Sequence, residues 1–150
     1  MNWVLITVDD LKAVAPGELV AAAQALVLPG QPDPVLAAIA DAVAAVRRAV
    51  GAGGNALDAE MAAVPGSLRG LTARTTIFAL RERMELALTA DQRTTRAADA
   101  ETLQRISEQR IRVEAPDQPT TGGGAAGFIG PVETVAPGNA GHGREELRGI

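Results

Sequence analysis

The sequence predicts an all-α protein, a small bundle of about four to five helices followed by a long, extended C-terminal arm rich in glycine and proline. Two observations lead to this prediction. The stretch from Asp33 to Gly51 has every signal of a helix, with apolar residues at helical spacing. From residue 115 onward, glycine and proline dominate instead. We therefore divide the 150-residue chain into a helical domain, residues 1–114, and an arm, residues 115–150.

The Asp33–Gly51 stretch is predicted to be the helix around which the chain is organised. Asp33 can cap its first amides, Pro34 suits the first helical position, and Gly51 can take the left-handed conformation that closes a helix. Arg47 and Arg48 are expected in the last turn, exposed, facing the negative end of the helix dipole. Most other positions are alanine, so the helix is predicted to be the centre of a bundle or the seam of an oligomer. The stripe predicted to pack subunits together is Leu36, Ile39, Val43, Val46 and Val50.

Two shorter helices are predicted before this central one. Residues 3–6 form an apolar lead that is expected to be extended and packed against a neighbour. Thr7 caps a short helix with acidic residues in its first turn, and Pro16 interrupts it. A second helix is expected to run from Gly17 to about Leu28, where a tight Pro-Gly-Gln-Pro connector follows.

Two more helices are predicted after a loop that runs from Gly51 to about Val64. The first begins near Pro65 and is amphipathic, with these residues at helical spacing: Leu68, Leu71, Thr75 and Phe78. The second begins at a capping box formed by Thr89 and Gln92 and runs to about Glu108. Its apolar stripe is thin, so it is expected to flank the bundle.

Composition and motifs argue against several kinds of site. The chain has no cysteine, a formal net charge of −4 and very few aromatic residues, which argues against thiolate metal sites, non-specific nucleic-acid binding and base stacking. Gly122, Gly124 and Gly127 have dinucleotide-loop spacing but follow no strand pattern. No apolar run reaches the roughly 20 residues of a membrane span. We expect no cofactor, no metal and no membrane association.

An enzyme is not expected either. The only histidine, His142, lies in the arm, and Ser67 and Ser107 have no nearby base in the sequence. Arginines and acids interleave along residues 91–114, which is typical of a solvated helix face rather than a nucleic-acid groove.

The arm carries apolar residues that a plain solubilising tail would not need. A segment this rich in glycine cannot bury a core of its own and is predicted to be ordered by a partner. The anchors that we expect at this partner interface are Phe128, Ile129, Val132, Val135, Leu147 and Ile150.

The order of these parts resembles a known family. A short start at residues 5–11 leads to an alanine-rich helix that ends with residues 46–50, and a loop closes on Val64-Pro65-Gly66-Ser67-Leu68-Arg69-Gly70. An amphipathic helix through residues 79–81 and a capped polar helix complete the pattern, which covers roughly Leu5 to Pro116. This arrangement is similar to the small helical head–tail connector proteins (adaptor or head-completion proteins) of tailed bacteriophages, of the type found in phage Mu.

The resemblance implies a structural protein of the virion neck, made in the host cytoplasm. Such proteins form a homo-oligomeric ring, usually dodecameric, beneath the portal protein and present a surface to the next neck or tail-completion protein. DNA would pass through the lumen of the ring without specific contacts. The alternative that the residues leave open is a small helical module that binds protein or nucleic acid and has a disordered C-terminal tail.

Overall fold

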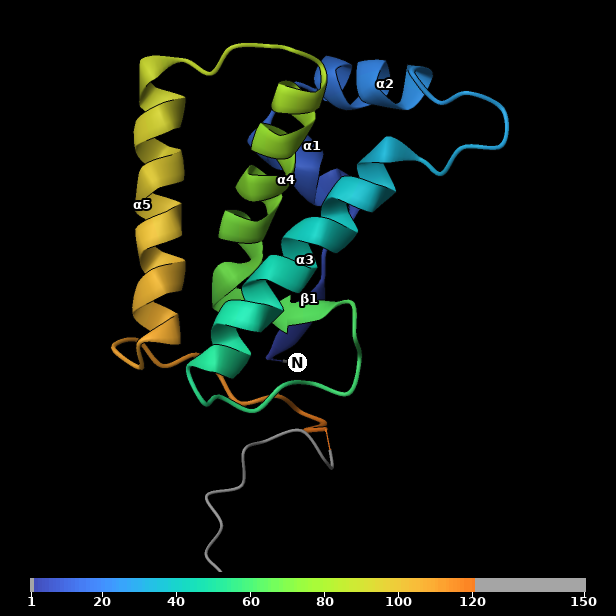
Figure 1. Ribbon diagram of the computed structural model, residues 1–150. Helices are drawn as coiled ribbons and strands as arrows, with labels where there is room; N and C mark the ends of the chain where they lie inside the picture. Colours follow the sequence, from blue (N-terminus) through green and yellow to red (C-terminus); the bar gives the residue numbers. More distant parts are fainter. Residues whose placement is uncertain (1, 121–150) are drawn as a thin grey trace, which may run out of the picture.

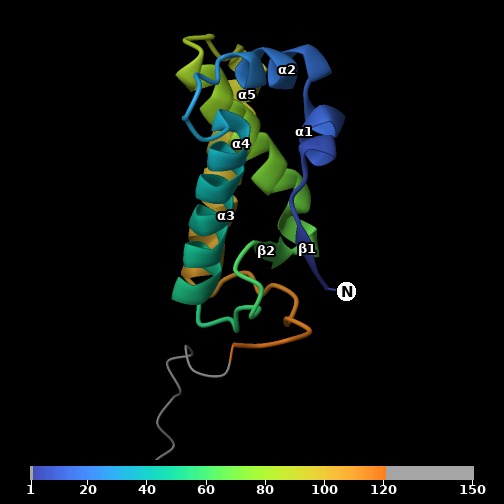
Figure 2. The same ribbon diagram turned by 90° about the vertical axis from the view of Figure 1, so that its right-hand side faces the viewer.

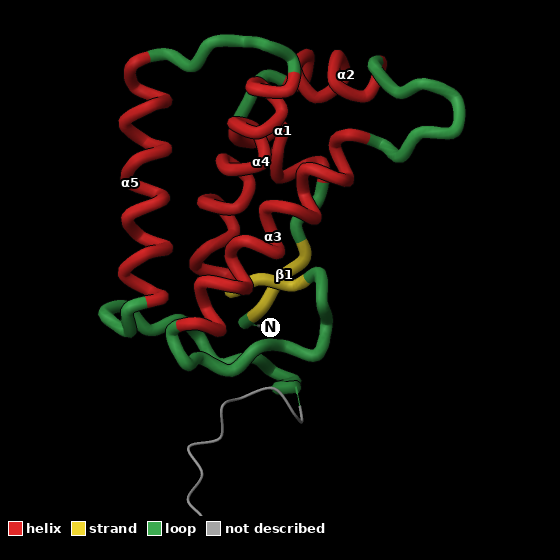
Figure 3. The backbone as a smooth tube through the Cα atoms, in the orientation of Figure 1, coloured by secondary structure: helices red, strands yellow, loops and turns green. Residues whose placement is uncertain are grey.

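The computed structural model describes residues 2–120 and confirms the all-α class, with five α-helices and one short two-stranded sheet in that part of the chain (Figures 1 and 3). In chain order the elements are β1 (Trp3–Leu5), α1 (Val8–Val14), α2 (Gly17–Ala25), α3 (Pro34–Ala52), β2 (Ala63–Pro65), the 3₁₀ turn η1 (Gly66–Leu68), α4 (Arg69–Arg83) and α5 (Ala90–Ser107).

Helix α3 is the centre of the bundle, as the sequence predicts. It packs against both α4 and α5, while α1 packs on α4 and α2 contacts α1 and α3. Figure 2 shows α3 running along the body from just below α2 to beyond the level of the sheet. The buried side chains of α3 that form the core are mostly small or β-branched: Val35, Ala38, Ile39, Val43, Val46 and Val50.

The start of α3 is as predicted, but its end is not. The carboxylate of Asp33 accepts a hydrogen bond from the Val35 amide at 2.8 Å. The helix continues through Gly51 to Ala52, and the left-handed residue is Gly54, with φ +72°. The predicted closure at Gly51 is therefore wrong, because the Gly53 amide still bonds the Ala49 carbonyl and extends the helix. Arg47 and Arg48 consequently lie before the last turn of α3 and not in it, where they were predicted.

Local capping chemistry sets the starts of two other helices. Thr7 and Asp10 form a reciprocal capping box at α1, and Thr89 and Gln92 form one at α5, which confirms both predicted starts. Helix α2 ends at Ala25, earlier than expected.

The apolar residues at the start of the chain form strand β1, and the neighbour that they were expected to pack against is β2 of the same chain. β1 pairs antiparallel with β2, with Trp3 opposite Pro65 and Leu5 opposite Ala63. The indole of Trp3 is buried and donates a hydrogen bond to the Glu114 carbonyl at 3.0 Å. The sheet thus joins the N-terminus, the loop after α3 and the segment after α5.

Helix α4 buries more polar atoms than its sequence pattern predicts. Thr72 and Thr76 are fully buried, and each hydroxyl donates to the carbonyl four residues earlier, at 2.8 and 2.9 Å. This hydrogen bond satisfies the hydroxyl inside the helix, so threonine can stand at a core position.

Helix α5 lies at one side of the bundle, as expected for its thin apolar stripe (Figure 1). Its one fully buried apolar side chain is Ile106. Ion pairs join the helix to α4: Arg74 makes two hydrogen bonds to the buried carboxylate of Asp99, at 2.6 and 2.9 Å, and Arg96 pairs with Glu82. Hydrogen bonding to Asp99 raises the pKa of Arg74 above its ordinary value.

The first residues of the predicted arm lie on the folded body. The Asn2 amide donates to the carboxylate of Asp117 at 2.9 Å, and the Ala59 amide donates to the Gln118 carbonyl at 2.7 Å. The Thr120 amide donates to the Leu57 carbonyl at 2.9 Å. Residues 117–120 therefore lie against the helical body, because these groups find hydrogen-bond partners far away in the sequence.

Glu114 anchors this C-terminal segment on the turn that leads into α4. Its carboxylate accepts hydrogen bonds from the Ser67 amide at 3.1 Å and from the Ser67 hydroxyl at 2.6 Å. Partial burial raises the pKa of Glu114, but the hydrogen bond from the Ser67 hydroxyl and those from the backbone amides outweigh it, so the net pKa is lowered. The charged form is thus the one that the fold stabilises.

We expect Glu114→Gln to lower the free energy of unfolding by about 1 kcal/mol at neutral pH, because it weakens a charge-assisted pair of hydrogen bonds. A lowered pKa gives stability that is present above the unfolded-state pKa, about 4.3, and is lost as the pH falls through the folded-state value. Urea unfolding at about pH 7 and about pH 3 should show the difference from wild type shrinking at the lower pH. Glu85→Gln is the control, since the Glu85 side chain has no hydrogen bond among the described residues; a pH-independent effect of Glu114→Gln would contradict the assignment.

Candidate functional site

An open apolar groove runs along the outer face of α3. It has a volume of about 1180 Å³ and lies between α3, the loop that leads to β2 and the chain around the end of β1. We call it the α3 groove and define it by these lining residues: Leu5, Leu36, Ala40, Ala44, Leu57 and Met61. Leu36 is 57% exposed and Met61 is 74% exposed, so apolar surface faces solvent on both sides of the groove.

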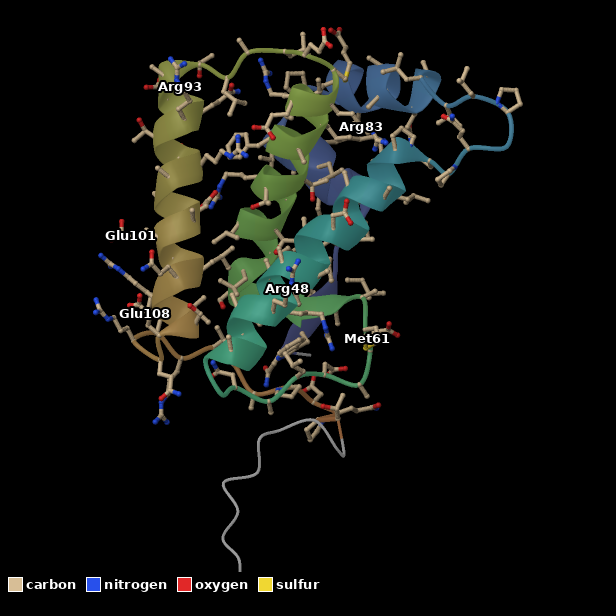
Figure 4. All side chains as sticks on the ribbon, viewed as in Figure 1. Arg48, Met61, Arg83, Arg93, Glu101 and Glu108 are labelled. Carbon is tan, nitrogen blue, oxygen red and sulfur yellow. The ribbon has the colours of Figure 1, made fainter. Side chains whose placement is uncertain are left out.

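The hollow follows from the spacing of small side chains on α3. Leu36, Ala40, Ala44 and Arg48 recur every four residues and therefore share one face of the helix. Ala40 and Ala44 are exposed and too small to fill the space beside them. Figure 4 shows Arg48 on α3 and Met61 on the loop across from it.

Arg47 holds the loop that forms the opposite wall. Its guanidinium donates to the carbonyls of Asp58 at 2.7 Å, Glu60 at 2.9 Å and Ala63 at 2.8 Å. The same group lies 5.4 Å from the centre of the Trp3 ring. Arg47 is only 6% exposed, so the expectation that it would resist burial is wrong. Backbone carbonyls and an aromatic face take the place of water around the charge.

Asp58 ties this wall to the C-terminal segment. Its buried carboxylate accepts hydrogen bonds from the Glu60 amide at 2.9 Å and from the Gln118 amide at 3.3 Å. Its backbone pairs with Pro119 in an isolated β-bridge. Thr120, where the described part of the chain ends, lines the groove.

Charged groups stand at the rim of the groove. Arg48 and Glu60 both line it and both are exposed. Arg48 forms no ion pair with any described residue. An apolar floor with a polar rim is the usual anatomy of a protein-binding surface.

Most of the stripe predicted to pack subunits packs the core of this one chain. Val46 and Val50 are fully buried, and Val43 and Ile39 are buried at the floor of the groove. Leu36 is the exposed member. Four groove residues were not predicted from the sequence: Ala40, Ala44, Leu57 and Met61. For the two alanines, their spacing of four residues on α3 was a signal in the sequence.

The other residues singled out in the sequence divide between the described body and the arm. The six arm anchors (Phe128, Ile129, Val132, Val135, Leu147 and Ile150) and His142 lie outside the described residues. Ser67 bonds Glu114, and the Ser107 hydroxyl donates to the Gln104 carbonyl at 2.7 Å. Within residues 2–120, no three His, Asp or Glu side chains gather in a way that could hold a metal ion.

Comparison with protein-family models, with curated proteins and with solved structures gave no match for this chain. None of the helices in the described part is long and apolar enough to cross a membrane.

Proposed function

We propose that this chain is a structural protein that acts by binding other proteins, as one subunit of a head–tail connector ring in a tailed bacteriophage. The observation that carries the proposal is the α3 groove. Contiguous exposed apolar surface of this kind marks interaction sites on soluble proteins. Among proteins that assemble in this way, the connector family is favoured because its order of helices and its sequence around Val64–Gly70 resemble those of this chain.

A second exposed apolar surface supports assembly into a ring. The connector between α2 and α3 carries Leu26 and Leu28, which are 61% and 60% exposed. It stands away from the helical body and is a different surface from the α3 groove (Figure 1). Contacts between two different faces of identical subunits are heterologous, and such contacts generate rings when the rotation between subunits closes.

The remaining contacts of the proposed assembly follow from the resemblance. The ring sits beneath the portal protein and presents its other side to a neck or tail-completion protein. The arm residues Phe128, Ile129, Val132 and Val135 contact one of these neighbours. DNA passes through the lumen without sequence-specific contacts, in keeping with arginines that pair with acids along α5.

We expect Leu36→Asp to reduce incorporation of the protein into phage particles by about tenfold or more, because it puts a charge into an apolar interface. The measurement is quantitative mass spectrometry of particles made when the variant replaces the native protein. Leu86→Asp is the matched control, since Leu86 is 41% exposed and lies away from the groove. Equal incorporation of both variants would mean that the groove takes no part in assembly, which would contradict the proposal.

The same method tests the connector assignment itself. Native particles should contain this protein in a number of copies near that of the portal protein. Its absence from particles would overturn the connector proposal and leave the alternative, a small helical module whose groove binds a peptide segment of another protein.

A further inference from the structure

Thr120, the last residue that the structure describes, lies at the edge of the α3 groove. The Thr120 amide is held by the Leu57 carbonyl at 2.9 Å, and both residues line the groove. The Ala59–Gln118 hydrogen bond fixes the chain just before this point. The described part of the chain therefore ends at the groove.

The length of this segment suits the groove. Phe128 comes eight residues after Thr120, and eight residues reach at most about 26–29 Å. The face of α3 between Leu36 and Gly51 is about 22 Å long. Phe128 can thus reach any part of the groove while Thr120 stays attached.

The chemistry of residues 128–135 also matches the groove. Phe128, Ile129, Val132 and Val135 supply apolar side chains for a floor of small residues. Glu133 stands among them in the sequence and carries a negative charge, and Arg48 at the rim of the groove has no ion-pair partner among residues 2–120. An apolar segment with one acidic group is thus complementary to an apolar floor at the end of the rim that carries Arg48, while the acidic Glu60 also lines the groove.

We propose that in the free subunit the segment Phe128–Val135 occupies the α3 groove of its own chain and covers the assembly surface until a partner displaces it. A tether of this length holds the segment at an effective concentration of about a millimolar, so even weak binding closes the groove. A partner that binds more tightly opens it. This inference concerns the isolated chain and does not depend on the identity of the ring.

Disulfide trapping tests the proposal, because the native chain has no cysteine. One full-length variant combines Ala44→Cys, in the groove, with Val132→Cys. The matched control combines Ala100→Cys, exposed on α5, with the same Val132→Cys. Under mild oxidation we expect the groove pair to form an intramolecular disulfide about tenfold faster than the control pair, since docking concentrates the thiols.

Three outcomes would overturn the proposal. Equal rates for the two pairs would show that the segment does not prefer the groove. Disulfide-linked dimers from the groove pair would show that the segment of another copy fills it. We expect Phe128→Asp to slow trapping of the groove pair to the rate of the control pair. Ala140→Asp adds the same charge outside the segment and should not slow it. The third contradicting outcome is a trapping rate of the groove pair that Phe128→Asp leaves unchanged. These results are read on the isolated protein, so they are independent of whether it is found in phage particles.

Discussion

Replacing Arg47 by methionine is expected to lower the free energy of unfolding by about 3–5 kcal/mol, one of the two largest effects that the structure indicates. The change removes the three hydrogen bonds that Arg47 donates to the carbonyls of Asp58, Glu60 and Ala63. The Glu60 carbonyl keeps a second donor, the Ala63 amide at 3.1 Å, so the loss falls mainly on the Asp58 and Ala63 carbonyls. A buried carbonyl that loses its partner costs about 1–3 kcal/mol. The loss is a large share of the roughly 5–15 kcal/mol that typically holds a domain together.

Urea unfolding of Arg47→Met beside Arg48→Met measures this effect. Arg48 is adjacent in sequence but exposed, so its replacement should change the stability by less than about 0.5 kcal/mol. Arg47→Lys should fall between wild type and Arg47→Met, because an ammonium group cannot match the planar fork that reaches three carbonyls. An effect of Arg47→Met no larger than that of Arg48→Met would contradict the role assigned to Arg47.

Replacing Gly53 by alanine is expected to destabilise the protein by about 3 kcal/mol. A Cβ atom at Gly53 would stand 2.2 Å from the Ile106 carbonyl oxygen, so the end of α3 and the end of α5 would have to separate. This contact is with backbone, and Ile106 itself is fully buried, which leaves no flexible side chain to move aside.

Gly17→Ala is the matched control for Gly53→Ala. Gly17 begins α2, and a Cβ atom added there would have nothing within 4 Å, so alanine should be neutral or stabilise by up to about 1 kcal/mol. Thermal or urea unfolding of the two variants compares them directly. Similar stabilities would mean that the close approach of α3 and α5 is not a constraint on folding.

The sequence by itself determined the class of the fold and the starts of α1, α2, α3 and α5, whereas α4 begins at Arg69, after β2 and a 3₁₀ turn, rather than near Pro65. Asp33 begins α3, and the Thr7–Asp10 and Thr89–Gln92 boxes begin α1 and α5. These starts are predictable because a cap joins residues two or three positions apart, so the chemistry is complete within one short stretch. The helix ends are less predictable, since the end of α3 depends on where Gly53 meets Ile106.

The tertiary structure alone decided the candidate site. Arg47 was expected at the surface, yet the chain returns after α3 and places three carbonyls around it. The same return forms β2, pairs it with β1 and leaves the exposed alanines of α3 as the floor of a groove. Hydropathy patterns report only which face of a helix is apolar. Whether that face is covered by the chain itself or left open depends on contacts between residues far apart in the sequence.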